Sequence, residues 1–173
     1  DVVEVDETHP WFGAVRVSLG ALGILTEVTL QCVPAFLLHA REEPMPLPEV
    51  LERLPELVGG NDHCEFYWFP HTEKALLKRN NRVPEGTEPA PLGRIRSLVD
   101  DELLSNGAFE LFNRLGHARP SLVPRINALS GSALSAREFI APSHEVFVSR
   151  RRVRFQESEF AMPRAALPEV IGA

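Results

Sequence analysis

The chain has 173 residues, of which 44% are hydrophobic and 24% charged, and its formal net charge is −6. This composition is typical of a globular chain, and no apolar run approaches the roughly 20 residues that a membrane-spanning helix needs. The negative charge disfavours general binding to a phosphate backbone, so the basic run at residues 150–152 indicates a solvated strand start rather than a nucleic-acid site. We expect a soluble cytoplasmic protein without a nucleic-acid partner, at most peripherally associated with a membrane.

The start of the chain has the pattern of a segment within a longer protein. Residue 1 is Asp rather than Met, residues 1–5 read as a strand in progress, and residues 167–173 read as the first turns of a helix. We therefore expect an internal fragment. Thr8 is a suitable cap for a short helix with its apolar stripe at Phe12, Val15 and Leu19.

Two glycines mark the hinge that follows, in Ser18-Leu-Gly-Ala-Leu-Gly-Ile-Leu-Thr26. Gly20 ends the helix, and with Gly23 it allows positive φ and removes Cβ, so that a flat group can lie against the main chain. The same spacing is also typical of a simple turn, and it lacks the strand-glycine-helix order of a Rossmann fingerprint. Alternating residues predict a strand over 24–33, with a domain boundary at Pro34.

Beyond Pro34 the elements alternate. We expect a strand at 35–42, a helix at 47–58 that Pro55 kinks or splits, and a strand at 62–69. A turn at 70–72 leads to a further strand at 74–82 and an exposed loop at 84–93. A helix, or two joined at residues 106–107, is predicted over 98–115 and ended by Gly116.

The last third of the chain is less regular. Prolines and a glycine interrupt residues 118–139, for which we predict neither helix nor strand. A strand is predicted at 152–162, and Pro163 starts a final helix. The whole pattern favours an α+β domain with a largely antiparallel sheet and covering helices. Such a sheet can bury one face under helices and turn the other to a ligand.

The two cysteines indicate neither a disulfide nor a metal site. Cys32 and Cys64 fall on predicted strands without close-spaced partners, as expected of buried free thiols in a reducing compartment. His63, Cys64 and His71 are near in sequence, but His63 and Cys64 point to opposite faces of one strand. That geometry disfavours joint metal coordination, and we expect no metal site.

Three segments together resemble one family. The hinge and following strand, residues 18–30, resemble the end of the flavin-binding domain in the vanillyl-alcohol-oxidase class. Glu65-Phe-Tyr-Trp-Phe-Pro-His-Thr72 resembles the sugar-lactone oxidases of that class, and Glu157-Ser-Glu-Phe-Ala-Met-Pro-Arg164 is similar to a later strand-to-helix segment. The specific group is the aldonolactone oxidoreductases, namely L-gulono-1,4-lactone and D-arabinono-1,4-lactone oxidases or dehydrogenases.

The resemblance implies an FAD-dependent enzyme of two domains. Residues 1–33 would be the C-terminal end of a PCMH-type FAD-binding domain, and residues 34–173 an incomplete substrate-binding cap domain. The implied reaction is hydride transfer from a sugar-lactone carbon to the flavin, with reoxidation by oxygen or another acceptor. The family's glycine-rich phosphate loop, its flavin-linking histidine, its Glu-x-Arg strand and its His-Trp-x-Lys motif are not matched, so the catalytic residues are expected outside this sequence.

The resemblance also implies binding residues. The cofactor-binding set consists of the hinge and its flanks, Ser18, Gly20, Gly23, Ile24 and Leu25. Ser18 is equally interpretable as a solvent-facing serine at a helix C-terminus.

Substrate binding is assigned to one face of the aromatic strand and the following turn, Glu65, Tyr67, Phe69 and His71. Packing within the cap domain is an equal interpretation for these residues. Glu157 and Glu159 share a predicted strand face and are candidates for a general base or simply a solvated pair.

Two other functions stay open. One is alditol oxidation within the same enzyme class, which differs in its open-chain substrate. The other is a non-catalytic α+β binding module, in which the aromatic strand is core. A phosphate loop upstream and a His-Trp-x-Lys motif downstream would favour the enzyme.

Overall fold

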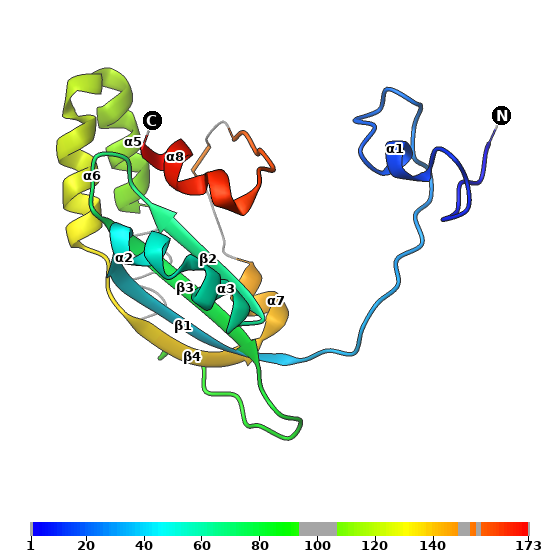
Figure 1. Ribbon diagram of the computed structural model, residues 1–173, viewed down its shortest axis with the longest axis horizontal. Coiled ribbons are helices and arrows are strands. Elements are labelled where there is room, and N and C mark those ends of the chain that lie inside the picture. The colour runs from blue at the N-terminus through cyan, green and yellow to red at the C-terminus, as the bar shows by residue number, and fades with distance from the viewer. Residues whose placement is uncertain (1, 94–106, 149–152, 155–156, 173) are drawn as a thin grey trace. The chain divides into compact units, whose positions relative to one another are not determined.

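A computed structural model describes residues 2–93, 107–148, 153–154 and 157–172 (Figure 1). The chain separates into two units, Asp1–Pro34 and Ala35–Ala173.

The first unit contains one helix, α1 (Phe12–Arg16), among its described residues. Thr8 does not cap it, contrary to expectation, because the Thr8 hydroxyl donates a hydrogen bond to Asp6 Oδ1 at 2.7 Å. Trp11 occupies the cap position without a side-chain hydrogen bond. The helix ends at Arg16, so it does not extend to Leu19, and the prediction that Gly20 ends it is wrong.

The predicted strand at 24–33 is wrong for this structure, and the described residues 2–5 are not a strand either. A strand is stabilised by hydrogen bonds to a neighbouring strand, and no described segment of this unit supplies them. The alternating side chains are consequently exposed, with Ile24 at 92% and Leu30 at 77%. Cys32 is also exposed, so its predicted burial is wrong.

The second unit is built on a four-stranded antiparallel sheet of order β2-β3-β1-β4. Its strands are β1 (Leu37–Pro46), β2 (His63–Trp68), β3 (Lys74–Arg82) and β4 (Arg137–Pro142). The predicted α+β class and antiparallel sheet are confirmed. β1 continues four residues past its predicted end, beyond the point where its pairing with β4 stops at Glu42, so its two prolines lie where it has only one neighbour.

Two short helices lie across one face of the sheet (Figure 1). They are α2 (Leu47–Glu52) and α3 (Leu54–Gly59), and the break at Arg53 confirms the split predicted from Pro55. Both helices have a proline in the first turn, where a backbone N–H would form no hydrogen bond within the helix, so that its absence costs nothing. Together with two strand residues they form a buried core of Leu47, Val50, Leu57, Ala75 and Leu77.

The other helices of the described ranges follow β3 in the chain. They are α5 (Phe109–Ala118), η2 (Pro120–Leu122), α6 (Val123–Ser132), α7 (Ser143–Phe147), η3 (Arg164–Ala166) and α8 (Leu167–Gly172). In the part of the chain that the structure describes, no helix has the length and apolar character to cross a membrane.

Several predictions for this region need correction. α5 passes through Gly116 and ends before Pro120, which disfavours helical geometry in the residue ahead of it. Residues 98–106 of the predicted helix lie outside the described residues. No strand is present among the described residues of 152–162, and β4 lies in a region without an assignment. The helix predicted after Pro163 is confirmed.

Candidate functional site

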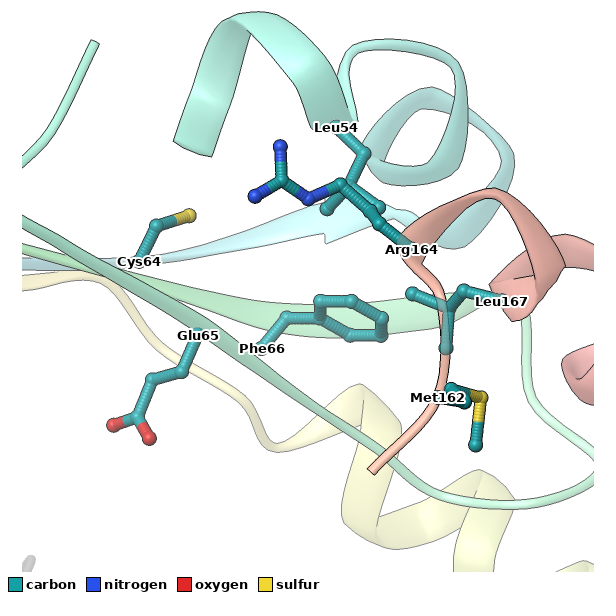
Figure 2. Close-up of a pocket in the computed structure, with 7 residues that line it drawn as sticks. All are labelled: Leu54, Cys64, Glu65, Phe66, Met162, Arg164 and Leu167. Atoms are coloured by element: carbon teal, nitrogen blue, oxygen red, sulfur yellow. The ribbon is translucent and has the colours of Figure 1, made fainter. Parts of the chain in front are cut away.

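Residue alternation along β2 divides its side chains between two environments. Cys64 and Phe66 lie on the face under α2 and α3, opposite Arg79 and Leu77 of β3. Glu65 points to the other side of the strand from Cys64, as Figure 2 shows. We call the first the helix-covered face, after α2 and α3. The second is named the polar face after the charged side chains described below, although buried Leu38 and Ala40 of β1 also lie on it and Phe147 of α7 packs against His63 there.

A row of charged side chains crosses the polar face through all four strands. Arg137 of β4 pairs in register with Glu42 of β1, Glu42 with Lys78 of β3, and Lys78 with Glu65 of β2. Glu42 Oε2 accepts a hydrogen bond from Arg137 Nε at 2.6 Å. Lys78 Nζ lies 3.4 Å from Glu42 Oε1 and 3.5 Å from Glu65 Oε1. The row therefore alternates in sign, and each cross-strand neighbour is an opposite charge.

The exposure of this charged row increases from β1 to the edge strand β2. The side chain of Glu42 is 7% exposed and that of Lys78 18%, whereas Glu65 is 51% exposed. Tyr67 extends the row at the exposed end, with its hydroxyl donating to Glu65 Oε2 at 3.5 Å and its ring 4.9 Å from Lys78 Nζ. A buried carboxylate thus anchors a group in which the Glu65 carboxylate and the Tyr67 phenol are exposed and the Lys78 ammonium between the two carboxylates is mostly covered.

This arrangement is suited to a neutral polar ligand. A carboxylate accepts hydrogen bonds, an ammonium donates them, and a phenol does both. Because the charges of Glu65 and Lys78 balance, a polyhydroxylated molecule can be bound through its hydroxyl groups without bringing a charge of its own. Rings such as Tyr67 add an apolar surface for the ligand's C–H groups.

The predicted substrate residues separate into three places. Glu65 and Tyr67 lie side by side on the polar face, as their alternation predicts. His71 is exposed at the apex of the β2–β3 turn, with φ of +68°. Phe69 lines a hollow of about 360 Å³ between that turn, α5 and α6. Phe69 therefore belongs to packing under the helices and not to the polar face.

Sequence reasoning missed three members of the charged row, Glu42, Lys78 and Arg137. The Glu65–Lys78 pair was predictable from the sequence, because a hairpin turning at residues 70–72 brings those two positions opposite each other. Arg137 was not predictable, since the sequence does not indicate the strand β4.

A second hollow, of about 450 Å³, lies largely on the helix-covered side of β2 (Figure 2). Its lining is Leu54, Cys64, Glu65, Phe66, Met162, Arg164 and Leu167. Burial raises the pKa of the Cys64 thiol, against a smaller opposing effect of Arg79, so Cys64 is a weakly reactive wall residue. This hollow contains neither Tyr67 nor His71, and its lining is mainly apolar.

The other titratable candidates do not form a site. His63 lies on the polar face and Cys64 on the helix-covered face, as predicted. Among the residues that the structure describes, no three His, Cys, Asp or Glu side chains are placed to hold a metal ion. Glu157 and Glu159 are exposed and lie outside any strand, so the strand face that they were predicted to share is absent.

The glycine hinge in the first unit has the backbone conformation that its sequence predicts. Gly20 and Gly23 have φ of +84° and +131°, and a Cβ placed on either would meet no atom within 4 Å. Ser18 is half-buried in the turn, where its carbonyl accepts a hydrogen bond from the Ala21 amide at 2.8 Å. Leu19 also has positive φ, at 47°. The main chain here is open to an approaching group.

Comparison with known proteins gives the family. A family model described as D-arabinono-1,4-lactone oxidase matches residues 28–173. L-gulono-1,4-lactone dehydrogenase of Mycobacterium tuberculosis is 43% identical over 164 residues, which are 95% of this chain and 37% of that protein. L-gulonolactone oxidase of Scyliorhinus torazame is 34% identical over 118 residues, which are 68% of this chain and 26% of that protein.

A fungal relative extends the range of names. D-arabinono-1,4-lactone oxidase of Yarrowia lipolytica is 30% identical over 77 residues, which are 44% of this chain and 15% of that protein. The chain thus spans little more than a third of the mycobacterial relative and less of the others. Since the family model matches most of its residues, the chain belongs to the D-arabinono-1,4-lactone oxidase family.

Proposed function

We propose that the full-length protein carrying this chain is an FAD-dependent oxidoreductase that oxidises a sugar 1,4-lactone. Two observations support the proposal. The chain belongs to a family whose named members act on aldonolactones. Its polar face ends in exposed Glu65 and Tyr67 beside the partly buried Lys78, and this group suits a neutral ligand rich in hydroxyl groups. The second observation carries the proposal at the level of residues.

In this proposal the two units have different roles. Residues 1–33 are the end of a PCMH-type FAD-binding domain, and residues 34–173 belong to the substrate-binding cap domain. The separation of the chain after Pro34 is consistent with that division. So is the location of the charged row, which lies entirely in the second unit.

The glycine hinge is compatible with a main-chain contact to FAD. Gly20 and Gly23 leave open space where side chains would otherwise stand. Ile24 and Leu25 make no backbone hydrogen bond within the described residues, so their amides and carbonyls are available. Ser18 would add its hydroxyl. When bound, FAD supplies the two-electron acceptor for the oxidation, and this chain's contribution is to hold and orient.

The polar face would bind the lactone. Glu65 would accept a hydrogen bond from a substrate hydroxyl, and Lys78 would donate one while keeping Glu65 oriented. The Tyr67 phenol would form a hydrogen bond with another substrate hydroxyl while its ring covers an apolar side of the sugar, and His71 would add a further polar contact. Oxygen or another acceptor would receive the electrons, and any membrane association would be peripheral.

Conservative variants of the exposed residues test this assignment. E65Q replaces a charged hydrogen-bond acceptor with a neutral one, and Y67F removes the phenol hydroxyl. We expect each variant of the full-length protein to raise KM for L-gulono-1,4-lactone about 10-fold. E88Q is a matched control, because Glu88 is exposed in the loop after β3. Unchanged KM in both E65Q and Y67F would remove the polar face from the substrate site. Oxidation of open-chain alditols in preference to lactones would identify the alternative substrate class.

A further inference from the structure

The connection between β2 and β3 is a tight turn with an unusual residue at its apex. The Thr72 amide donates to the Phe69 carbonyl at 3.2 Å, which closes a four-residue turn over Phe69-Pro70-His71-Thr72. Proline at the second position and φ of +68° at His71 define a type II turn. The third position of such a turn favours glycine, because side chains with a Cβ are strained at positive φ. Histidine therefore occupies a position at which glycine would be the better backbone choice.

Side chains from around the turn hold its carbonyl groups in place. The Thr72 hydroxyl donates to the Phe69 carbonyl at 2.7 Å, and Trp68 Nε1 donates to the Thr72 carbonyl at 2.6 Å. Asn127 of α6 donates from Nδ2 to the Pro70 carbonyl at 3.0 Å. Three side chains thus determine the path of a turn only four residues long.

Helix α6 also packs closely against the turn. A Cβ built on the buried Gly131 would lie 3.5 Å from Thr72 Cγ2. Asn127 and Gly131 are four residues apart and lie on the same face of α6, so this face both donates a hydrogen bond to the β2–β3 turn and packs against it. The apex is therefore held by a helix from a distant part of the sequence and not only by its own strands.

The His71 side chain itself contributes nothing to this framework. It is exposed, and within the described part of the chain its imidazole has no hydrogen-bond, ion-pair or ring partner. A strained backbone position that the surroundings hold in place, with an exposed polar side chain, is a feature of ligand-contacting sites. The conformational cost at His71 is not offset by any contact that the imidazole makes within this structure.

We propose that Asn127 is the positioning residue of His71, whose contact with the substrate belongs to the proposed function. This inference rests on the proposed function, and it adds that α6 sets the direction of the imidazole through the Pro70 carbonyl. The imidazole would donate or accept one hydrogen bond at an oxygen of the sugar lactone. Replacement of His71 by glycine would relieve the turn and at the same time remove the contact, so stability and activity would change in opposite directions.

Four variants of the full-length protein test the proposal with L-gulono-1,4-lactone as the probe. H71N keeps a residue that tolerates positive φ, and H71G removes the strain. We expect both to raise KM about 10-fold with kcat changed less, and H71G to have a Tm equal to or above that of the wild type. H144N is the matched control, because His144 is an exposed histidine of α7 in the same unit, and it should leave KM unchanged.

N127A tests the positioning role. It should raise KM several-fold in the wild-type background but not in the H71N background, because a positioning residue acts through the imidazole that H71N lacks. A purely structural Asn127 would raise KM equally in both backgrounds. Wild-type KM in H71N and H71G would overturn the proposal, and so would an N127A effect that persists in H71N. If H71G does not fold, H71N still decides. A wild-type protein inactive on every aldonolactone would instead refute the proposed function itself.

Discussion

Glu42 and Arg137 are 95 positions apart in sequence and form a two-point ion pair across β1 and β4, with nitrogen–oxygen distances of 2.6 and 2.9 Å. The Glu42 side chain is almost completely buried, and it also lies beside Lys78. A bidentate contact of this kind sets the relative orientation of two strands as well as their spacing. It therefore fixes the end of the row at β1 and β4, while Glu65 on β2 is the other end.

Removal of the Glu42 carboxylate should be costly. E42A breaks a largely buried ion pair, for which losses of about 3–5 kcal/mol are typical. E138A is the control on β4, because the Glu138 side chain is 57% exposed and surface pairs contribute about 0–1 kcal/mol. Urea unfolding of both variants measures the difference. Equal stability of E42A and the wild type would show that the pair does not anchor the sheet.

The glycine hinge gives a second prediction. G23A places a side chain at φ of +131°, a conformation that L-residues rarely adopt, although no neighbouring atom blocks it. The hinge should move, and G23A should therefore retain less FAD on purification than the wild type. G13A is the control, since Gly13 is in α1 with open space around it and alanine favours a helix by roughly 0.5–1 kcal/mol. Flavin absorbance per protein is the measurement, and full FAD occupancy in G23A would argue against a main-chain contact.

Stability should depend on pH through Glu56. The Arg53 guanidinium donates to its carboxylate at 2.9 Å and holds the pKa of Glu56 below its ordinary value of 4.5. A lowered pKa in the folded state stabilises the protein above pH 4.5, and the contribution disappears as pH falls through the folded-state pKa. The Tm difference between wild type and E56Q should accordingly be present at pH 6, small because the pair is exposed, and absent at strongly acidic pH. A difference that does not change with pH would contradict the assignment.

The local elements of the second unit were predictable because their signals are local. Three local features specify the hairpin: the alternation in β2, the proline and threonine around His71, and the lysine and arginine positions of β3. Pro55 predicts the break between α2 and α3 for the same reason, since it acts on the residues next to it.

Elements that depend on distant partners were not predictable in this way. β4 is a strand because it pairs with β1. The prolines and glycine near it in the sequence hide the strand pattern. Residues 24–33 show the converse, because their alternation is that of a strand, yet no described neighbour pairs with them. The site divides along the same line: Glu65 and Tyr67 follow from alternation, whereas Glu42 and Arg137 meet only through the sheet's long-range register.

In the proposed function the full-length protein passes electrons from a sugar lactone to bound FAD, with Glu65 at the substrate. Anaerobic mixing with L-gulono-1,4-lactone or D-arabinono-1,4-lactone measures this transfer, with the oxidised flavin absorbance near its visible maximum as the signal. The proposal predicts bleaching in the wild type and in E88Q, and bleaching in E65Q only at about 10-fold higher lactone concentration. Wild-type flavin that stays oxidised with every aldonolactone would contradict it.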